Sequence, residues 1–419
     1  MRLPPSVASL KHHRTIVILI MLSAAFACAI TCNTASMIVS RWGLIHAKSG
    51  LDESRLSIIS FDIIRSRLGG NSKLKAGKDG NAEVKENYRI LYKEYAAKMR
   101  HIPGVKNVSA IDGLPLRDGS ITAVSATSEM DEASMIDVAT YDGDENEVQT
   151  LGLKIVRGRN FTPNEYLPSS NNARNVSSAI ISQSLEKKLF HESDAIGQLI
   201  YVMGSPVRVI GVVKHLMIID PRLGLGSNEY SMLLPLDPDG PSVTFALNVM
   251  PSEQENAVEL AKKMLSEANP YLIVTDAEPF SSIRKVYFHQ EYTMILLLVT
   301  CSFALLIVTV AGFLGLIVFW IKQRTRSIGI RRAVGATRGH IHLLIHIENF
   351  WIVFGGALIG SFLAISLSLF LRKFYAMQEL QIYYLGIGSL IILAAGQIAV
   401  IIPAMRASSI SPMAAMRSF

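Results

Sequence analysis

The residues with the strongest chemical character lie in one short stretch, Lys322 to His342, which reads KQRTRSIGIRRAVGATRGHIH. It holds six Lys or Arg residues and no Asp or Glu. One long apolar run stops just before it at Ile321, and another begins just after it at Leu343. A short basic loop between two membrane-length segments is typical of the cytoplasmic side of a membrane. The stretch is therefore predicted to lie in the cytoplasm and, because it is structured as well as basic, to be bound there by a partner.

The basic stretch also has helical spacing, which distinguishes it from a simple tether. Ser327–Ile341 is predicted to form a short helix with an apolar and a basic face. The Gly335-Ala336 step would let the surface of a partner come close. The apolar face comprises Ile330, Ala333, Val334 and Ile341, and the polar face comprises Arg331, Arg332 and Arg338.

Motifs for catalysis or nucleotide binding are missing from the sequence. Gly77-Lys78 is followed by Asp79 and lacks the glycine that the P-loop spacing requires. No G-x-S-x-G elbow and no H-E-x-x-H motif occurs. Acidic residues such as Asp112 and Asp118 are scattered and are interpreted as solvated surface. The chain is therefore predicted not to be an enzyme by itself.

Two groups of residues have a chemical interpretation and a structural one. Three histidines near the start of the third apolar run either bind a metal ion or lie at the membrane interface, and the interface is favoured. Three cysteines lie within apolar runs. Two of them, Cys28 and Cys32, share a helix face and either serve redox or metal chemistry or are small residues at a helix–helix contact, and the contact is favoured. These residues are His340, His342 and His346, and Cys28, Cys32 and Cys301.

Composition indicates a membrane protein. Half of the 419 residues are apolar and the mean hydropathy is +0.32. Four apolar runs reach about the 20 residues that a membrane-spanning helix needs. They are Thr15–Val39, Tyr292–Ile321, residues 343–371 with their most apolar part at Phe350–Leu371, and Ile382–Ile402.

Charge predicts how the chain crosses the membrane. Residues 1–14 carry three basic residues, 322–342 six and the tail 403–419 two, and none of these segments contains an acid. The net charge of +7 is thus explained by membrane topology rather than by nucleic-acid binding. Both termini and the basic loop are predicted to be cytoplasmic, with residues 40–291 and a short loop at 372–381 outside.

The first apolar run has a rival interpretation. A basic residue followed by Ile16–Ile30 and then small residues is also the pattern of a cleavable signal peptide, and Ala25–Cys28 faintly resembles a lipoprotein cleavage site. However, the run continues to Val39, beyond the roughly 7–15 residues of an ordinary signal core. A membrane anchor is therefore favoured.

The large segment between the first two runs has mixed α/β patterning. Val84–Met99 has helical spacing and precedes a strand at Val105–Ile111. A second helix and strand occupy residues 252–268 and 271–275, with Ser252 and Glu255 spaced as a capping box. The two helix–strand units suggest a weak internal repeat that flanks an insertion.

The insertion, at about residues 118–240, is richer in strand patterns. Leu199–Met203 and Val207–Val213 are predicted to form a hairpin across Gly204-Ser205-Pro206. Thr244–Met250 is predicted to be another strand, and Gly69–Asn81 is a loop by composition.

In these features the chain resembles the MacB-type permeases of the FtsX-like family, the membrane subunits of type VII ABC transporters. The resemblance covers nearly the whole chain. The matching stretches keep the family's order and are IPGV (Ile102–Val105), GLKIVRGRNFT (Gly152–Thr162), IISQSLEKKLF (Ile180–Phe190), AIG (Ala195–Gly197), VIGVV (Val209–Val213), RTRSIGIRRAVGATRGHI (Arg324–Ile341), Glu348, the glycines Gly355, Gly356 and Gly360, and PAMRASSISPMAAMR (Pro403–Arg417).

The resemblance implies an α-helical protein of the bacterial inner membrane with four transmembrane helices and a large extracytoplasmic mixed α/β domain in two parts. The basic stretch would be the coupling helix that docks on a separate ABC ATPase, which binds ATP and Mg while this chain binds no cofactor. Glu348 would contact the coupling stretch at Arg331 or Arg332, or else lie at the lipid headgroups. The implied coupling residues are Arg326, Ile330, Arg331, Arg332, Gly335, Ala336, Arg338 and Glu348, and the closing motif includes Pro403, Arg406, Pro412 and Arg417.

The resemblance also implies partners and leaves the function open in part. Family members dimerise, so a second permease copy or a paralogue is expected, with a periplasmic adaptor and an outer-membrane channel in some members. No attached ATPase domain and no nucleic acid is expected. The favoured function is ATP-driven export of a peptide, antibiotic or other amphiphile. The alternatives are release of lipoproteins from the membrane and signalling to a cell-wall hydrolase or sensor.

The sequence departs from the family at two positions. Ser327 stands where the family usually has Glu, and Ala414-Ala415-Met416-Arg417 replaces a closing motif that usually contains Glu. Because an exposed ion pair contributes only about 0–1 kcal/mol, docking could survive these losses. A heterodimer whose partner permease keeps the acids is the alternative hypothesis.

Overall fold

The computed structural model describes residues 14–64, 80–128, 135–169, 175–191, 193–223, 229–375 and 380–409. The chain folds as two compact units. One, here called the large domain, comprises residues 47–289, and the other, the helical unit, comprises the residues up to 46 and from 290 onward. The predicted fold class, four apolar helices and a large mixed α/β domain, is confirmed.

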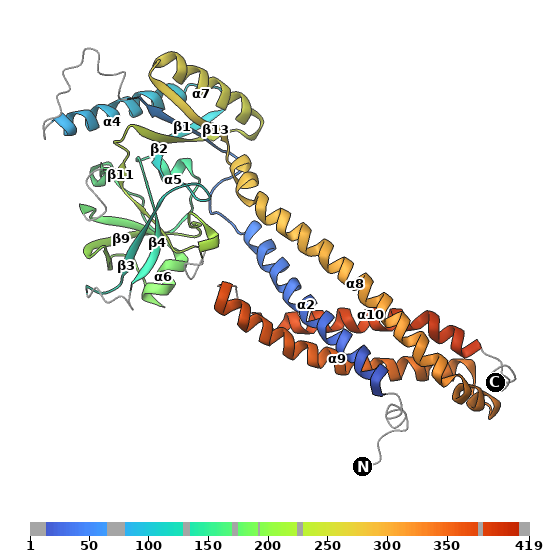
Figure 1. The fold of residues 1–419 in the computed structure, drawn as a ribbon. Helices are drawn as coiled ribbons and strands as arrows, with labels where there is room; N and C mark the ends of the chain where they lie inside the picture. Colours follow the sequence, from blue (N-terminus) through green and yellow to red (C-terminus); the bar gives the residue numbers. More distant parts are fainter. Residues whose placement is uncertain are drawn as a thin grey trace. The chain divides into compact units, whose positions relative to one another are not determined.

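Four long helices are apolar enough to cross a membrane (Figure 1). Each is longer than the apolar run that predicted it, because helical structure continues into polar residues at the ends. The expected span from Tyr292 to Ile321 is the middle of a single helix of 54 residues. The helices are α2 (Arg14–Ile45), α8 (Phe280–Ala333), α9 (Arg338–Tyr375) and α10 (Ile382–Ser409).

Small residues bring α2, α9 and α10 close together. A Cβ atom added to Gly360 of α9 would lie 2.5 Å from the carbonyl oxygen of Ala25 in α2, and one added to Gly388 of α10 would lie 2.3 Å from the sulfur of Cys32. The sulfur of Cys28 lies 3.6 Å from the carbonyl oxygen of Ala357. The preferred interpretation of these two cysteines, as small residues at helix–helix contacts, is confirmed.

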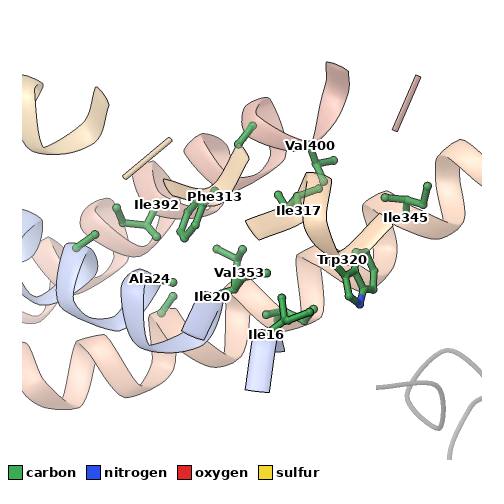
Figure 2. Packing of buried hydrophobic residues seen from close by; sticks show 14 of the residues in the cluster. Ile16, Ile20, Ala24, Phe313, Ile317, Trp320, Ile345, Val353, Ile392 and Val400 are labelled. Atoms are coloured by element: carbon green, nitrogen blue, oxygen red, sulfur yellow. The ribbon is translucent and has the colours of Figure 1, made fainter. Parts of the chain in front are cut away.

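The C-terminal half of α8 packs against this bundle. Figure 2 shows Phe313 and Trp320 of α8 among Ile20 of α2, Val353 of α9 and Val400 of α10, and all five side chains are buried. In a membrane such contacts stabilise through close packing, because lipid tails are as apolar as the side chains themselves.

The first part of the large domain is a four-stranded antiparallel sheet with two helices. The strand order is β2-β12-β1-β13, and α4 and α7 each connect two strands, which gives the βαββαβ topology of ferredoxin-like folds. The predicted pair of helix–strand units is thereby confirmed. The elements are β1 (Leu56–Ile63), α4 (Gly80–Met99), β2 (Val105–Asp112), β12 (Ser242–Val249), α7 (Gln254–Ala268) and β13 (Leu272–Pro279).

An inserted part leaves the sheet after Asp112 and returns at Ser242, where about 118–240 was expected. Its six main strands pair in the order β10-β7-β9-β8-β3-β4, and a parallel pair between β4 and β10 closes them into a barrel. The strands are β3 (Ser120–Ser125), β4 (Ile136–Gly143), β7 (Ser178–Ser182), β8 (Leu199–Val202), β9 (Ser205–Val213) and β10 (Ser231–Leu234).

Shorter elements complete the inserted part, and its interior is filled by aliphatic side chains such as Val138, Ile181 and Val209. In the described ranges, two residue pairs between β2 and β4 connect the strands of the barrel to those of the first sheet. The shorter elements are α5 (Glu147–Thr150), β5 (Ile155–Gly158), β6 (Leu167–Pro168), α6 (Gln183–Phe190) and β11 (Leu236–Asp237).

Local predictions had mixed outcomes. The hairpin of β8 and β9 is confirmed, but it turns at Met203-Gly204, where both residues have positive φ, rather than at Gly204-Ser205-Pro206. The capping box at Ser252 is wrong, because a 3-10 turn at Pro251–Glu253 precedes α7 and Glu253 is its N-cap without a side-chain bond. The loop predicted for residues 69–81 is helical at residues 80–81, and its remainder lies outside the described residues.

Candidate functional site

The basic stretch does not form a helix of its own. α8 continues through it to Ala333, and α9 begins at Arg338. Gly335 separates them with a φ of +105°. Its N–H donates to the carbonyl of Arg332 at 3.1 Å, and the N–H of Ala336 donates to that of Arg331 at 3.1 Å, which together are the bonds of a Schellman motif. The predicted helix Ser327–Ile341 is therefore wrong, because the positive φ of Gly335 ends α8 inside it.

The next helix is capped directly after this turn. The hydroxyl oxygen of Thr337 accepts a hydrogen bond from the backbone N–H of His340 at 3.2 Å, as an N-cap does. Only four residues therefore separate α8 from α9, and both helix ends are satisfied by local bonds. We call residues 330–338, which include this connection, the basic turn.

The basic turn presents charged and apolar groups together. Arg331 and Arg338 are exposed, and Arg332 is half-buried. Ile330 is 51% exposed and Val334 is 84% exposed, although both are apolar. Apolar side chains ringed by arginines at a helix end are typical of a surface that binds another protein.

The other predicted coupling residues have different environments. Gly335 is exposed, with open space where a Cβ would be, and Ala336 packs partly against the helical core. Arg326 lies in α8, and its side chain is outside the described residues. Gly335 thus has a conformational role that the sequence interpretation, a close approach by a partner, did not include.

Glu348 of α9 is fastened to α8 by a buried ion pair. Its carboxylate accepts a hydrogen bond from Arg324 at 2.6 Å, and the side chains are 3% and 16% exposed. The guanidinium of Arg324 also lies 4.6 Å from the centre of the Trp320 ring, in a cation–π contact. The carboxylate of Glu348 is thus paired inside the protein.

The partner of Glu348 lies in the predicted coupling stretch but is a different arginine from the two expected. Arg331 or Arg332 was predicted, whereas the structure pairs Glu348 with Arg324, which lies two turns before Arg331 on the same helix face. Arg331 and Glu348 do line one small pocket of about 70 Å³ together with Arg324. Sequence reasoning missed Arg324 because, within a run of six basic residues, no local signal distinguishes the one that faces α9.

The opposite end of α8 is fastened inside the large domain. Arg284 donates to the carboxylate of Glu53 at 2.6 Å and to the carbonyl of Ala47 at 2.6 Å. Phe280 and Phe288 on the same helix are buried. These residues were not predicted, because the first turns of α8 are polar and precede the apolar run.

A second contact holds the same turns of α8. The Tyr287 hydroxyl donates to Asp220, and the guanidinium of Arg222 lies 4.5 Å from the centre of the Tyr287 ring. Partial burial would raise the pKa of Asp220, but hydrogen bonds from Arg222 and Tyr287 outweigh burial and lower it. Asp220 is therefore an ionised acceptor at neutral pH.

Between these two ends, α8 has a stretch without fully buried side chains. No residue from 292 to 312 is buried. The half-buried Leu306 and Val310 pack against the helical core, and fully buried side chains of α8 follow from Phe313 to Ile321. Near the start of this stretch, an ion pair joins Glu291 to Arg41 of α2. The first turns of α8 are thus bonded within the large domain, residues 292–312 have no fully buried side chain, and Phe313–Ile321 packs against the other helices.

The remaining predicted residues lie near the end of α10 or on α9. Pro403 is buried within α10 and Arg406 is exposed, while Pro412 and Arg417 lie outside the described residues. The Nδ1 atom of His346 lies 2.8 Å from the side-chain oxygen of Gln397. Among the described residues no three His, Cys, Asp or Glu side chains gather in a way that could hold a metal ion.

Acidic residues gather where the barrel meets the first sheet. Asp112 is exposed, as predicted, but it lies directly opposite Asp142 in the β2–β4 pair. Burial, together with the charge of Asp112, raises the pKa of Asp142 to about 8. Burial also raises the pKa of Glu147 well above its usual range, with Asp142 and Asp144 adding to the shift. Spacing alone had suggested no pairing of these acids.

Comparison with known proteins gives two family matches. The model for the MacB-like periplasmic core domain matches residues 29–266, more than half of the chain, and the model for the FtsX-like permease C-terminal region matches residues 299–412. An uncharacterized ABC transporter permease, YknZ of Bacillus subtilis (strain 168), is 28% identical over 312 residues, which are 70% of this chain and 74% of that protein.

Other relatives are longer than this chain. The macrolide export ATP-binding/permease protein MacB of Neisseria gonorrhoeae (strain ATCC 700825 / FA 1090) is 28% identical over 243 residues, which cover 56% of this chain but only 36% of that protein. Among solved structures, the extracellular domain of YknZ from Gram-positive bacteria matches 52% of this chain and 100% of that chain, at 16% identity and a TM-score of 0.31. The periplasmic region of MacB from Actinobacillus actinomycetemcomitans matches 58% and 97%, at 14% identity and a TM-score of 0.33.

Proposed function

Because the chain belongs to the family of MacB-like, FtsX-like permeases, we propose that it is the membrane subunit of an ATP-driven ABC transporter whose long helix α8 carries movement between an ATPase and the large domain. The family and the four apolar helices indicate a protein of the bacterial inner membrane. In this proposal the chain itself catalyses nothing. ATP and Mg are bound, and ATP is hydrolysed, by a separate ABC ATPase subunit.

The observation that carries the proposal is the continuity of α8. A helix of 54 residues is about 80 Å long and resists bending far better than a loop. Arg284 and Tyr287 bond the first turns of α8 to other residues of the large domain. Arg324, in the C-terminal part of α8, bonds it to Glu348 of α9. In this proposal, a displacement applied at the C-terminal end of α8 is carried along the helix toward the large domain.

The basic turn is the proposed docking surface for the ATPase. Exposed arginines around Ile330 and Val334 supply charge complementarity and a small apolar centre, which is the usual composition of a protein interface. Arg324, Glu348 and Trp320 lie behind this surface and connect it to α9. The exposed Arg406 of α10 belongs to the same proposed contact.

The proposed topology follows the charge distribution. The basic turn and both termini are cytoplasmic, and the large domain is extracytoplasmic, which agrees with its match to a periplasmic core domain. The spans then run outward in α2, inward in α8, outward in α9 and inward in α10.

The apolar stretch of α8 that has no fully buried side chain supports a dimer. Residues 292–312 are apolar and have no buried member, so a second permease copy or a paralogue is the proposed neighbour along this stretch. A paralogue would suit Ser327, where the family usually has Glu. A periplasmic adaptor and an outer-membrane channel complete the assembly if the transporter exports a peptide, antibiotic or other amphiphile.

The test is affinity purification of the full chain from its native membrane in mild detergent, followed by identification of all proteins recovered. The proposal expects an ABC ATPase with the native chain and its loss from the doubly substituted Arg331→Glu, Arg332→Glu variant. The matched control, Arg331→Lys with Arg332→Lys, keeps the charge and should retain the ATPase. Failure to recover an ATPase, or equal recovery with the Glu variant, would overturn the docking assignment.

The same experiment distinguishes the classes of function. An adaptor recovered with the chain supports export, bound lipoproteins support lipoprotein release, and a cell-wall hydrolase or sensor supports signalling. Recovery of copies of this chain alone, with the ATPase, would contradict the heterodimer hypothesis.

A further inference from the structure

A cleft of about 310 Å³ opens in the large domain between α4 and the inserted part. Its volume lies at the lower end of the range of roughly 300–1,000 Å³ that small-molecule sites occupy. Residues of both parts of the domain line it, so it lies across their junction. The lining residues are Arg89, Lys93 and Ala96 of α4, Arg100 directly after it, and Asp144, Glu145, Asn146, Pro163, Tyr166 and Asp237 of the inserted part.

The two walls of the cleft carry opposite charge. Arg89 and Lys93 are four residues apart on one face of α4, and Arg100, directly after the end of the helix, lines the same cleft. The inserted part contributes only acids among its charged lining residues. Three basic side chains thus face three acidic ones, and the cleft as a whole is close to neutral but strongly dipolar.

Some of these charges are already satisfied within the protein. Arg89 donates to Asp237 at 2.6 Å and to Glu86 at 2.9 Å. Asp144 accepts a hydrogen bond from the hydroxyl of Ser109 at 2.7 Å and others from backbone N–H groups. These bonds hold the two walls in place and leave little capacity for a ligand at that end.

Other charges remain available. Lys93 and Glu145 are exposed and have no hydrogen-bond or ion-pair partner among the described residues. Arg100 makes one long bond, of 3.3 Å, to the carbonyl of Val108, which leaves most of its five N–H donors unused. Two cations on one wall and one anion on the other are therefore free to bind.

We propose that this cleft binds a zwitterionic small molecule of the size of a short peptide, with its ammonium group at Glu145 and its carboxylate at Lys93 and Arg100. A simple anion would be attracted by Lys93 and Arg100 but repelled by the acidic wall, and a simple cation would meet the reverse. An uncharged amphiphile would have to desolvate these charged walls without pairing them. Only a ligand with both charges satisfies both walls.

The inference goes beyond the proposed coupling to an ATPase, because binding in this cleft requires neither ATP nor a partner protein. A bound peptide would add a further bridge between the two parts of the domain, beside the β2–β4 pairs and the bonds of Arg89 and Asp144. The ligand would therefore stabilise one arrangement of the two parts of the large domain.

Isothermal titration of the full chain in lipid nanodiscs tests the inference. The probes are trialanine, which carries both end charges, N-acetyl-trialanine, which carries only the carboxylate, and trialanine amide, which carries only the ammonium. We expect measurable binding of trialanine, and binding of each blocked peptide weaker by at least about tenfold, since one charge-assisted bond is lost in each case.

Variants locate the site. Lys93→Ala combined with Arg100→Ala should weaken trialanine binding at least about tenfold, and Glu145→Gln should weaken it by a smaller factor. Lys98→Ala is the matched control, because Lys98 is an exposed lysine of the same helix that pairs with Glu94 and does not line the cleft. Its trialanine binding should equal that of the native chain.

Three outcomes would overturn the inference. They are no heat of binding for trialanine at millimolar concentration, equal binding of the N-acetylated or amidated peptide, and a loss with Lys98→Ala as large as with the double variant. Because the ATPase is absent from the titration, none of these outcomes bears on the proposed coupling.

Discussion

The helix α8 and the bundle of α2, α9 and α10 are held by different means. In the bundle, glycines bring backbones into contact, so that a Cβ on Gly356 or Gly360 would lie within 2.7 Å of a backbone oxygen of α2. In α8, Gly312 and Gly315 have open space around them, and residues 292–312 are not buried. The bundle is therefore held by close backbone contacts, whereas residues 292–312 of α8 contribute no fully buried side chain and contact the bundle through the half-buried Leu306 and Val310.

The largest effect on stability is expected from breaking the ion pair between Arg324 of α8 and Glu348 of α9. Glu348→Ala leaves Arg324 buried without its counter-charge, and removing one partner of a buried pair costs about 3–5 kcal/mol. Thermal unfolding in detergent would measure the loss. The control, Glu94→Ala, removes an exposed ion pair with Lys98 and should change stability by less than about 1 kcal/mol.

A double variant shows whether the loss comes from the unpaired charge. Arg324→Met with Glu348→Leu replaces both partners by apolar residues of similar size, which is often neutral for a buried pair. It should recover most of the stability lost in Glu348→Ala. A double variant that is less stable than the single one would mean that the geometry of the pair, and not charge balance, fastens α8 to α9.

A glycine pair tests the contrast between the bundle and α8 directly. Gly360→Ala places a methyl group 2.5 Å from the carbonyl oxygen of Ala25 and should destabilise the chain by about 1–3 kcal/mol. Gly315→Ala in α8 meets no atom within 4 Å and should be neutral or stabilise by up to about 1 kcal/mol, because alanine favours helix. Equal destabilisation by both substitutions, measured as unfolding midpoints, would remove the contrast.

The dependence of stability on pH distinguishes the junction of the barrel and the first sheet, at Asp142, from the contact of Asp220 with Tyr287 of α8. The pKa of Asp142 is raised to about 8, so between about pH 4 and pH 8 the folded chain binds more protons here than the unfolded chain does. Stability should therefore rise as the pH falls from 8 to 5, by at least about 1 kcal/mol. Asp142→Asn should flatten this dependence in denaturant unfolding at several pH values.

Asp220 provides the opposite case. Its pKa is lowered, so its contribution to stability is present at neutral pH and is lost only as the pH falls below its unfolded-state value. Asp220→Asn should therefore leave the slope between pH 5 and 8 unchanged. If it abolished the slope, the pH response would belong to the contact of Asp220 with Tyr287 and not to the junction of the barrel.

The smallest effect on stability is expected at the basic turn. Gly335→Ala forces alanine into a positive φ and should cost about 1 kcal/mol. Gly339→Ala, in the first turn of α9 with open space around it, should cost nothing. If coupling requires the sharp break between α8 and α9, ATPase recovery should fall with Gly335→Ala alone. Equal recovery with both variants would show that the break serves folding only.

Local periodicity was enough to predict the parts of the fold with short-range patterns. Val84–Met99 and the strand after it, the β8–β9 hairpin and the four apolar helices were all found in this way. Closure of the barrel was not predicted, because the parallel pair of β4 and β10 joins residues far apart in the chain and leaves no local pattern.

The candidate site was predicted less fully than the fold. The exposed arginines of the basic turn are visible in the sequence, since charge density is a local property. The Arg324–Glu348 pair and the contacts of Arg284 are tertiary, and their residues resemble their neighbours in type. Gly335 was singled out, but its positive φ, which ends α8, follows from backbone conformation that spacing does not specify.

The position of the barrel within the sheet has a consequence for how such proteins diversify. The chain departs after Asp112 and returns at Ser242, and Ile111 and Thr244 are paired neighbours in the antiparallel β2–β12 ladder. Without the barrel, the two strands would be a simple hairpin that a tight turn could close. Evolution can therefore exchange the whole inserted module for another, or dispense with it, while the sheet that receives α8 keeps its topology.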